Sequence, residues 1–135
     1  MPEVGKRKPQ FGVMRLIDAT GYRLPLAGFV SILHRASGML MFILLPFVLY
    51  LLEKSLTSED SFSALKSFAS LWFVKLIILA LSWAYLHHFC AGIRHLLMDF
   101  HIGLDKDSGR KSAVGVLVVS LTLAALVALK LFEVF

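Results

Sequence analysis

The stretch LIILALSWAYLHHFCAGI, residues 76–93, decides the fold of this chain. It contains no Lys, Arg, Asp or Glu, and its length approaches the roughly 20 apolar residues that a helix needs to cross a bilayer. Two adjacent histidines, His87 and His88, interrupt the apolar run. Because ionisable side chains inside a membrane are costly and usually face a protein interior, the stretch predicts a membrane-spanning helix that carries a functional site.

Two further uncharged stretches, residues 36–52 and 112–129, flank the first. Together they predict an all-α integral membrane protein with three transmembrane helices, at about residues 26–52, 67–100 and 111–135. The intervening segments 53–66 and 101–110 contain Ser, Gly and charged residues, and they are expected to be solvated loops. Residues 1–25 are expected to form a cytoplasmic N-terminal segment, and residues 26–135 a three-helix transmembrane domain. Pro46 should bend the first helix.

The composition supports a membrane protein. Of the 135 residues 58% are hydrophobic and 17% charged. This hydrophobic fraction lies well above that of an average soluble domain, and the mean hydropathy is +0.77. The net charge of +5 comes largely from a basic N-terminal flank, which is typical of a membrane protein, and no nucleic-acid partner is expected. The N-terminus lacks the compact apolar region of a cleaved signal peptide. A single cysteine, Cys90, rules out a disulfide within the chain.

The distribution of Lys and Arg predicts the orientation of the helices. Five such residues precede Leu24, three lie in the second predicted loop or directly after it, and two lie in the first predicted loop. Under the positive-inside rule, the N-terminus and the second loop are cytoplasmic, and the first loop and the C-terminus are periplasmic. The start of the first helix and the end of the second therefore lie on the same side.

Those two helix ends each carry a polar stripe. At helical spacing, one face of the first helix presents Ser31, His34, Arg35 and Gly38. The corresponding face of the second helix presents His88, Gly92, His95 and Asp99. Residues at these spacings share one helix face.

Such stripes can hold a haem. Haem iron in helical cytochromes is bound by imidazole nitrogens that project between helices, and His88 lies one turn from the small residue Gly92. The propionates need cations, and Arg94 lies about 9 Å further toward the cytoplasm. Arg35, His34 and His95 lie at a similar level.

Other interpretations of these residues remain open. His88 is equally compatible with a hydrogen-bonding residue of the bundle interior. Arg35 and Arg94 could be anchors whose charged ends extend to the membrane surface. The chain could then be a small transporter or channel subunit with an ion path, or a purely structural membrane anchor without haem.

Two segments carry a family resemblance. SILHRASG, residues 31–38, and HFCAGIRHLLMD, residues 88–99, resemble the two signature segments of the succinate dehydrogenase cytochrome b subunit, the membrane anchor of complex II. The second segment carries the pattern H-x-x-x-G-I-R-H. The resemblance covers residues 23–135 and departs from the family before Pro25, where many relatives have RPLSPHL. Fumarate reductase shares the general architecture, and the signatures favour the succinate-oxidising type.

The resemblance implies specific roles. It makes His88, rather than His87, an axial ligand of the iron of haem b, with the other ligand supplied by a second small membrane subunit that shares the haem. It assigns Ser31 and Arg35 to the ubiquinone pocket. It also assigns the following residues to the haem propionates: His34, Arg94 and His95.

The resemblance also implies partners and a location. A flavoprotein subunit with FAD and an iron-sulfur subunit dock on the cytoplasmic side, and electrons pass from succinate to ubiquinone. The chain is then a non-autonomous subunit of succinate:ubiquinone oxidoreductase that serves electron transport and the tricarboxylic acid cycle. It would lie in the bacterial inner membrane and contain no catalytic residue of succinate oxidation.

Overall fold

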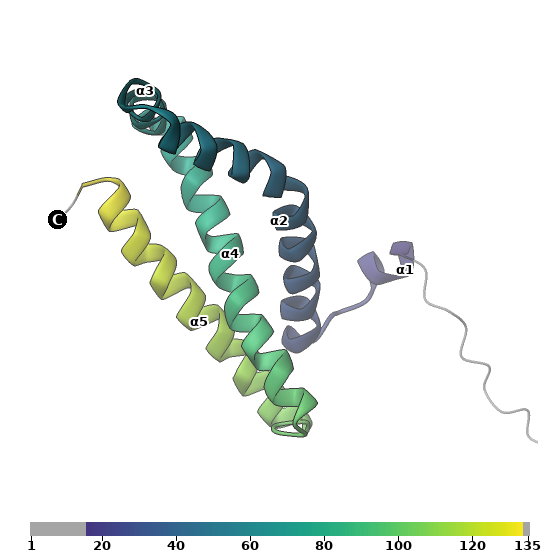
Figure 1. The fold of residues 1–135 in the computed structure, drawn as a ribbon. Coiled ribbons are helices and arrows are strands. Elements are labelled where there is room, and N and C mark those ends of the chain that lie inside the picture. The colour runs from purple at the N-terminus through teal and green to yellow at the C-terminus, as the bar shows by residue number, and fades with distance from the viewer. Residues whose placement is uncertain (1–15, 134–135) are drawn as a thin grey trace, which may run out of the picture.

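The computed structural model describes residues 16–133, and within them every regular element is a helix. Figure 1 shows the five helices in chain order. Their bounds are α1 Leu16–Gly21, α2 Leu26–Thr57, α3 Glu59–Ala69, α4 Trp72–Asp99 and α5 Lys106–Leu131. The all-α prediction is confirmed, while Lys6, Arg7, Lys8 and Arg15 of the basic flank lie outside the described residues.

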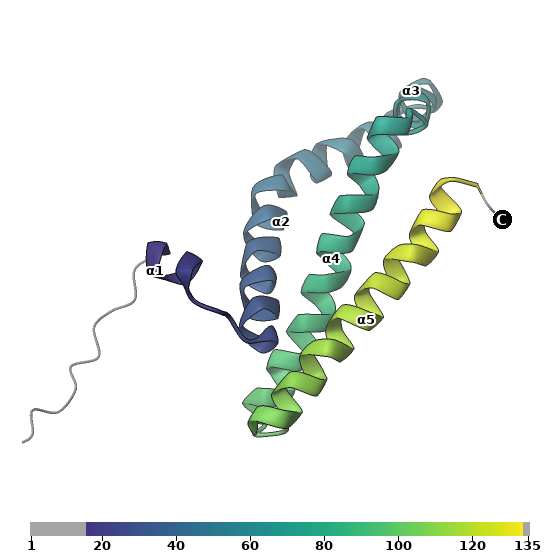
Figure 2. The same cartoon turned by 180° about the vertical axis from the view of Figure 1, so that it is seen from behind.

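Three helices, α2, α4 and α5, are long and apolar enough to cross a membrane. Consecutive long helices run in opposite directions, α4 packs against both α2 and α5, and α2 also contacts α5 (Figures 1 and 2). The prediction of three spans is confirmed. The end of α4 and the start of α5 lie at the end of the bundle where α2 begins.

The interior of the bundle is built from small side chains. The buried apolar cluster consists of Val30 from α2, Ala91 from α4, and Ala113 and Val116 from α5. Small residues let helix backbones approach closely. Helices in a membrane associate through such close packing, because lipid provides no hydrophobic driving force between them. The large apolar side chains are mostly exposed on the outer surface, as expected for contact with lipid or with other subunits.

The predicted loop at residues 53–66 is wrong, because α2 continues to Thr57 and α3 follows almost at once. Ser58 ends one helix and starts the next through a capping box. The Ser61 backbone N–H donates to Ser58 Oγ at 3.1 Å, and the Ser58 backbone N–H donates to Ser61 Oγ at 3.2 Å. Acidic residues in the first turn favour a helix start through the helix dipole. As a result α4 begins at Trp72 rather than at residue 67.

The third span begins at Lys106 rather than at residue 111. Asp105 caps this helix, because its carboxylate accepts a hydrogen bond of 3.0 Å from the Ser108 backbone N–H. Hydrogen bonds from Ser108 hold the pKa of the Asp105 carboxyl below its usual range. In the short connection before it, His101 (φ 60°) and Gly103 (φ 71°) have left-handed backbone conformations. His101 is exposed.

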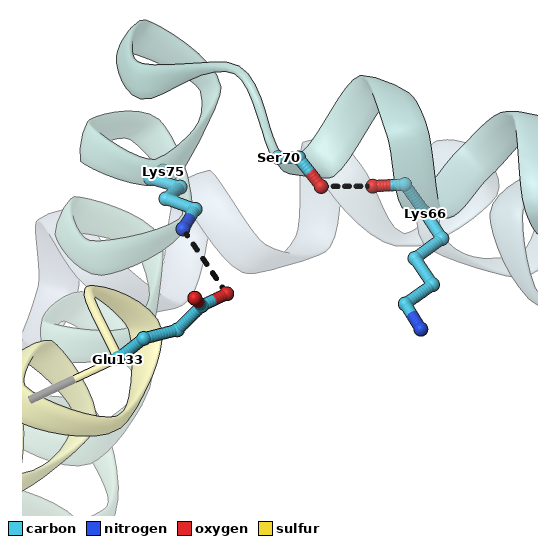
Figure 3. Close-up of polar contacts among 4 residues, drawn as sticks. All are labelled: Lys66, Ser70, Lys75 and Glu133. Carbon is cyan, nitrogen blue, oxygen red and sulfur yellow. Dashed lines mark hydrogen bonds and ion pairs between the residues drawn. The ribbon is translucent and has the colours of Figure 1, made fainter. Parts of the chain in front are cut away.

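Several contacts lie near the C-terminus, at the other end of the bundle. Figure 3 shows the Lys75 ammonium of α4 beside the Glu133 carboxylate, with an N–O distance of 3.9 Å. The same ammonium lies 5.7 Å from the centre of the Phe132 ring. Nearby, the Ser70 hydroxyl donates to the Lys66 carbonyl at 2.7 Å and closes the end of α3 (Figure 3). Within α2, Pro46 lies in the helix interior, and α2 bends in its C-terminal half (Figure 1), as an internal proline explains.

Candidate functional site

Three histidines gather where α2 and α4 cross. The rings of His34 on α2 and His88 on α4 are stacked, with centroids 4.2 Å apart and planes 18° apart. His95, two turns further along α4, lies 4.9 Å from His34 between ring centroids. The two polar stripes that the sequence predicts therefore meet, as the antiparallel arrangement of these helices requires.

The hydrogen bonds of His88 define which of its nitrogens is available. Nδ1 lies 3.1 Å from the backbone carbonyl of His34 and 3.2 Å from Ser37 Oγ, and the Ser37 hydroxyl itself donates to that carbonyl at 2.9 Å. A carbonyl oxygen only accepts, so in the neutral ring Nδ1 carries the proton. Nε2 then keeps its lone pair, and it makes no hydrogen bond within residues 16–133.

The position of the His88 ring depends on the absence of a side chain at Gly38. A Cβ built at Gly38 would lie 2.8 Å from Cε1 and 3.3 Å from Nδ1 of His88. Real Cβ atoms essentially never approach another atom so closely. At Gly92, by contrast, a Cβ would lie 3.6 Å from His34 Nε2, which is an ordinary contact.

His87, the neighbour of His88, has a different environment. Its side chain is 1% exposed, and its ring lies 5.6 Å from that of Trp83, centroid to centroid. Adjacent residues on a helix point about 100° apart, so one histidine is sealed between α2 and α4 while the other lies at the edge of their interface.

Ser31 and Arg35 lie on α2, one turn apart and close to His34. Ser31 is half-buried and Arg35 is exposed. Within the described part of the chain neither side chain makes a hydrogen bond or an ion pair. Both polar groups are therefore available to a ligand at this end of the bundle.

Arg94 does not join the histidines. Its side chain is buried, with 6% exposed, and its Nε donates to Ser112 Oγ of α5 at 2.9 Å. A second guanidinium nitrogen lies 3.4 Å from the Gly109 carbonyl. The structure thus brings His34, His88 and His95 together, with Ser31 and Arg35 beside them, and directs Arg94 to the opposite interface.

Sequence reasoning missed three residues that shape this region. Ser37 contacts His88, Trp83 packs beside His87, and Ser112 accepts from Arg94. A serine three residues after His34 was a usable signal, because i and i+3 share a helix face. The contacts to Trp83 and Ser112 depend on how the helices pack, which no local pattern reveals.

The donor set fits a haem. A metal-binding histidine commonly donates its second ring N–H to a carbonyl or another acceptor, which fixes the tautomer and the ring orientation. His88 has this arrangement, in an apolar bundle with further imidazoles at one edge. Among residues 16–133, His88 is the histidine whose ring nitrogen has these acceptors.

Comparisons with known proteins identify the family. Residues 17–127 match the succinate dehydrogenase/fumarate reductase transmembrane subunit family. A succinate dehydrogenase cytochrome b556 subunit of Coxiella burnetii is 38% identical over 106 residues, which cover 77% of this chain and 84% of that protein. The subunit of the same name from Paracoccus denitrificans is 31% identical over 111 residues, covering 82% and 85%. This chain therefore belongs to the family of succinate dehydrogenase/fumarate reductase transmembrane subunits.

Proposed function

We propose that this membrane subunit of succinate dehydrogenase binds haem b through Nε2 of His88. The observation that carries the proposal is the pair of hydrogen-bond acceptors at Nδ1, the His34 carbonyl and Ser37 Oγ, which directs the ring proton away from Nε2. The relatives in Coxiella burnetii and Paracoccus denitrificans are named cytochrome b556 subunits, which supports a haem. Bound haem would supply a one-electron carrier beside the quinone site.

The haem would be shared with a second small membrane subunit. His88 lies at an edge of the α2–α4 interface, its ring is stacked against that of His34, and the ring of His95 is tilted by 39° to that of His34. The second imidazole that holds the iron would then come from a helix outside this chain.

Within this proposal, His34 and His95 would lie near the haem propionates and could donate hydrogen bonds to them. Arg94 would have to release Ser112 before it could meet a propionate. Its position next to α5 supports a role in holding the bundle together, and the two roles can be separated by experiment.

We further propose that Ser31 and Arg35 bind the headgroup of ubiquinone. The Ser31 hydroxyl donates to a quinone carbonyl oxygen, and the Arg35 guanidinium stabilises the negative charge that develops on that oxygen during reduction. The absence of competing partners among residues 16–133 supports this assignment, as does their position one turn apart near the end of α2.

The same end of the bundle would face the cytoplasm. An iron-sulfur subunit and a flavoprotein subunit with FAD dock there and deliver electrons from succinate to the quinone. The Lys and Arg residues near the starts of α2 and α5 support this orientation in a bacterial inner membrane, with the N-terminus inside and the C-terminus in the periplasm.

The two adjacent histidines provide the test. His88→Ala should abolish or convert the low-spin b-type reduced-minus-oxidised spectrum of the assembled complex, because Nε2 is lost. His87→Ala should retain that spectrum, because adjacent helical side chains cannot both reach one iron. An unaltered low-spin spectrum in the His88 variant would reject the ligand assignment.

A further inference from the structure

The short helix α3 lies at the end of the bundle opposite the histidine cluster (Figure 1). Figures 1 and 2 show the three long helices from the side and α3 nearly end-on, so α3 runs across the ends of α2 and α4 rather than along them. A single residue, Ser58, separates α2 from α3, and two residues, Ser70 and Leu71, separate α3 from α4. A helix that joins two membrane spans so closely lies near the membrane surface.

α3 has an apolar face and a polar face. With about 100° between successive residues, its apolar residues fall within one arc about 160° wide, in which Ser61 is the one polar member. The apolar residues are Phe62, Ala64, Leu65, Phe68 and Ala69. The opposite face is polar and exposed, and it consists of Glu59, Asp60, Ser63, Lys66 and Ser67.

Only the middle of the apolar face is covered by the rest of the chain. This half-buried strip consists of Ser61, Leu65 and Ala69. It lies toward α2, because the Ser61 hydroxyl donates to the Lys54 carbonyl of that helix. The phenyl groups of Phe62 and Phe68 lie on either side of the strip, and these two residues remain 52% and 55% exposed. Two large apolar side chains are therefore left uncovered beside the α2–α3 contact.

The helix ends that adjoin α3 have the composition of a membrane–water boundary. Trp72, the first residue of α4, is 71% exposed, and the Lys54 ammonium near the end of α2 lies 5.5 Å from the centre of the Tyr50 ring. Exposed Trp and Tyr with nearby Lys are typical of this boundary. The exposed phenyl groups of α3 thus continue the apolar outer surface of the spans.

We propose that α3 lies in the plane of the bilayer surface, with Phe62 and Phe68 among the acyl chains and the polar face toward water. The partner is the phospholipid at the boundary between head groups and acyl chains. α3 carries two acidic residues and one basic residue, so its charge does not favour anionic head groups. Insertion of apolar side chains supplies the binding, and neutral phosphatidylcholine is sufficient.

The attachment of α3 to α2 gives this contact a structural role. The reciprocal Ser58 and Ser61 hydrogen bonds and the bond from Ser61 to the Lys54 carbonyl hold the two helices together. α3 in the bilayer surface therefore fixes the depth at which the adjoining ends of α2 and α4 lie in the membrane. This placement depends on neither the haem proposal nor the quinone proposal.

The experiment places nitroxide spin labels on the two faces of α3 in the assembled complex, in phosphatidylcholine nanodiscs. The variants are Phe62→Cys and Phe68→Cys, with the adjacent polar positions Ser63→Cys and Ser67→Cys as matched controls. The parental complex, treated with the same label, supplies the background from other cysteines. Labels at residues 62 and 68 should collide more with oxygen, which dissolves in acyl chains, than with a water-soluble nickel chelate. Labels at residues 63 and 67 should show the reverse.

Two results at residues 62 and 68 would overturn the proposal. Low collision rates with both reagents would mean that a partner subunit covers the apolar face, and a preference for the nickel chelate would mean that this face lies in water. A lipid pattern that appears only after anionic lipid is added would reject insertion driven by apolar side chains.

A second measurement keeps the aromatic side chains if the cysteine variants fail to assemble. The fluorescence added by Phe62→Trp or Phe68→Trp should be quenched by lipids with brominated acyl chains, while that added by Ser67→Trp should not. Equal quenching on both faces would contradict the proposed placement of α3.

Discussion

The ring of His88 has so little clearance over α2 that one methyl group at residue 38 decides its position. The predicted Cβ contact of 2.8 Å with Cε1 falls on a ring whose Nδ1 is already held by two acceptors on α2. The ring cannot yield without breaking those hydrogen bonds. Gly38 therefore belongs to the machinery that orients the proposed ligand, although it offers no chemistry of its own.

Gly38→Ala should lower haem affinity about 10- to 100-fold, the range seen when a partner that orients a metal ligand is lost. Haem content per assembled complex, measured from the reduced-minus-oxidised spectrum, gives the result. Gly28→Ala is the matched control, because a Cβ there meets its nearest atoms at an ordinary 3.6 Å. Equal haem content in the two variants would contradict the steric argument.

Variants of Ser31 and Arg35 test the proposed quinone contacts separately from the proposed haem ligand. Ser31→Ala and Arg35→Ala should each reduce succinate-to-quinone electron transfer by about 100-fold, the lower end of the range for the loss of one hydrogen bond to developing charge. The Ser31 variant should keep its haem spectrum. Electron transfer from succinate to an artificial acceptor that takes electrons from the flavin should persist in both variants. Parental quinone kinetics in both variants would reject the proposed quinone contacts.

Most of the site could be predicted from its residues, because helical spacing alone aligns Ser31, His34 and Arg35 on one helix and His88 with His95 on the other. Helical spacing could not show that His87 is sealed and His88 lies at the edge, because burial depends on how α2 and α4 pack. It also could not show that Arg94 turns toward α5. A buried guanidinium and one at a haem edge give the same local sequence pattern.

At the scale of the helices, Arg94 links α4 to α5. It reaches across the interface to Ser112 and the Gly109 carbonyl, close to the start of α5. A charged group in such a position needs hydrogen-bond acceptors, since lipid supplies none. These hydrogen bonds should therefore stabilise the packing of α5 against α4.

Ser112→Ala should destabilise the complex by about 1–3 kcal/mol, because it leaves the buried Nε of Arg94 without its acceptor. The midpoint of thermal unfolding in detergent measures the effect. Ser120→Ala is the matched control: Ser120 is also buried, but its hydroxyl donates to the Leu117 carbonyl of its own helix. A haem spectrum that changes in Arg94→Gln but not in Ser112→Ala would place Arg94 at a propionate instead.

The sequence predicts a helix correctly where the length of an apolar stretch is enough to identify it. All three spans were found, yet α3 was missed, because its Ser, Glu and Asp residues match the composition of a loop. The reciprocal Ser58 and Ser61 hydrogen bonds turn the same residues into a helix start. The start of α5 was misplaced for the same reason, since Asp105 and Ser108 form a cap within a polar segment. The residues that cap a helix were therefore the signal for these two helix starts, and a reading based on hydropathy did not include them.

At the scale of the whole molecule, orientation in the bilayer determines whether the site can receive electrons. Reporter fusions at Ser70, between α3 and α4, should read periplasmic, and fusions at Gly103, between α4 and α5, should read cytoplasmic. The basic residues around the α4–α5 connection provide the physical reason. The reverse pattern would place the histidine cluster on the side away from the soluble subunits and reject the proposed docking face.

The open edge of the histidine cluster has a consequence for the life of the chain before assembly. A copy of the chain without partner subunits exposes polar imidazole groups to lipid, which offers them no hydrogen bonds. Its outer surface then contacts lipid instead of partner subunits. Such an orphan copy should be the form that membrane proteases capture, whereas an assembled copy is protected. The half-built site would thereby act as a check on subunit stoichiometry, so that synthesis of this chain in excess shortens its half-life rather than enlarging the pool of complex.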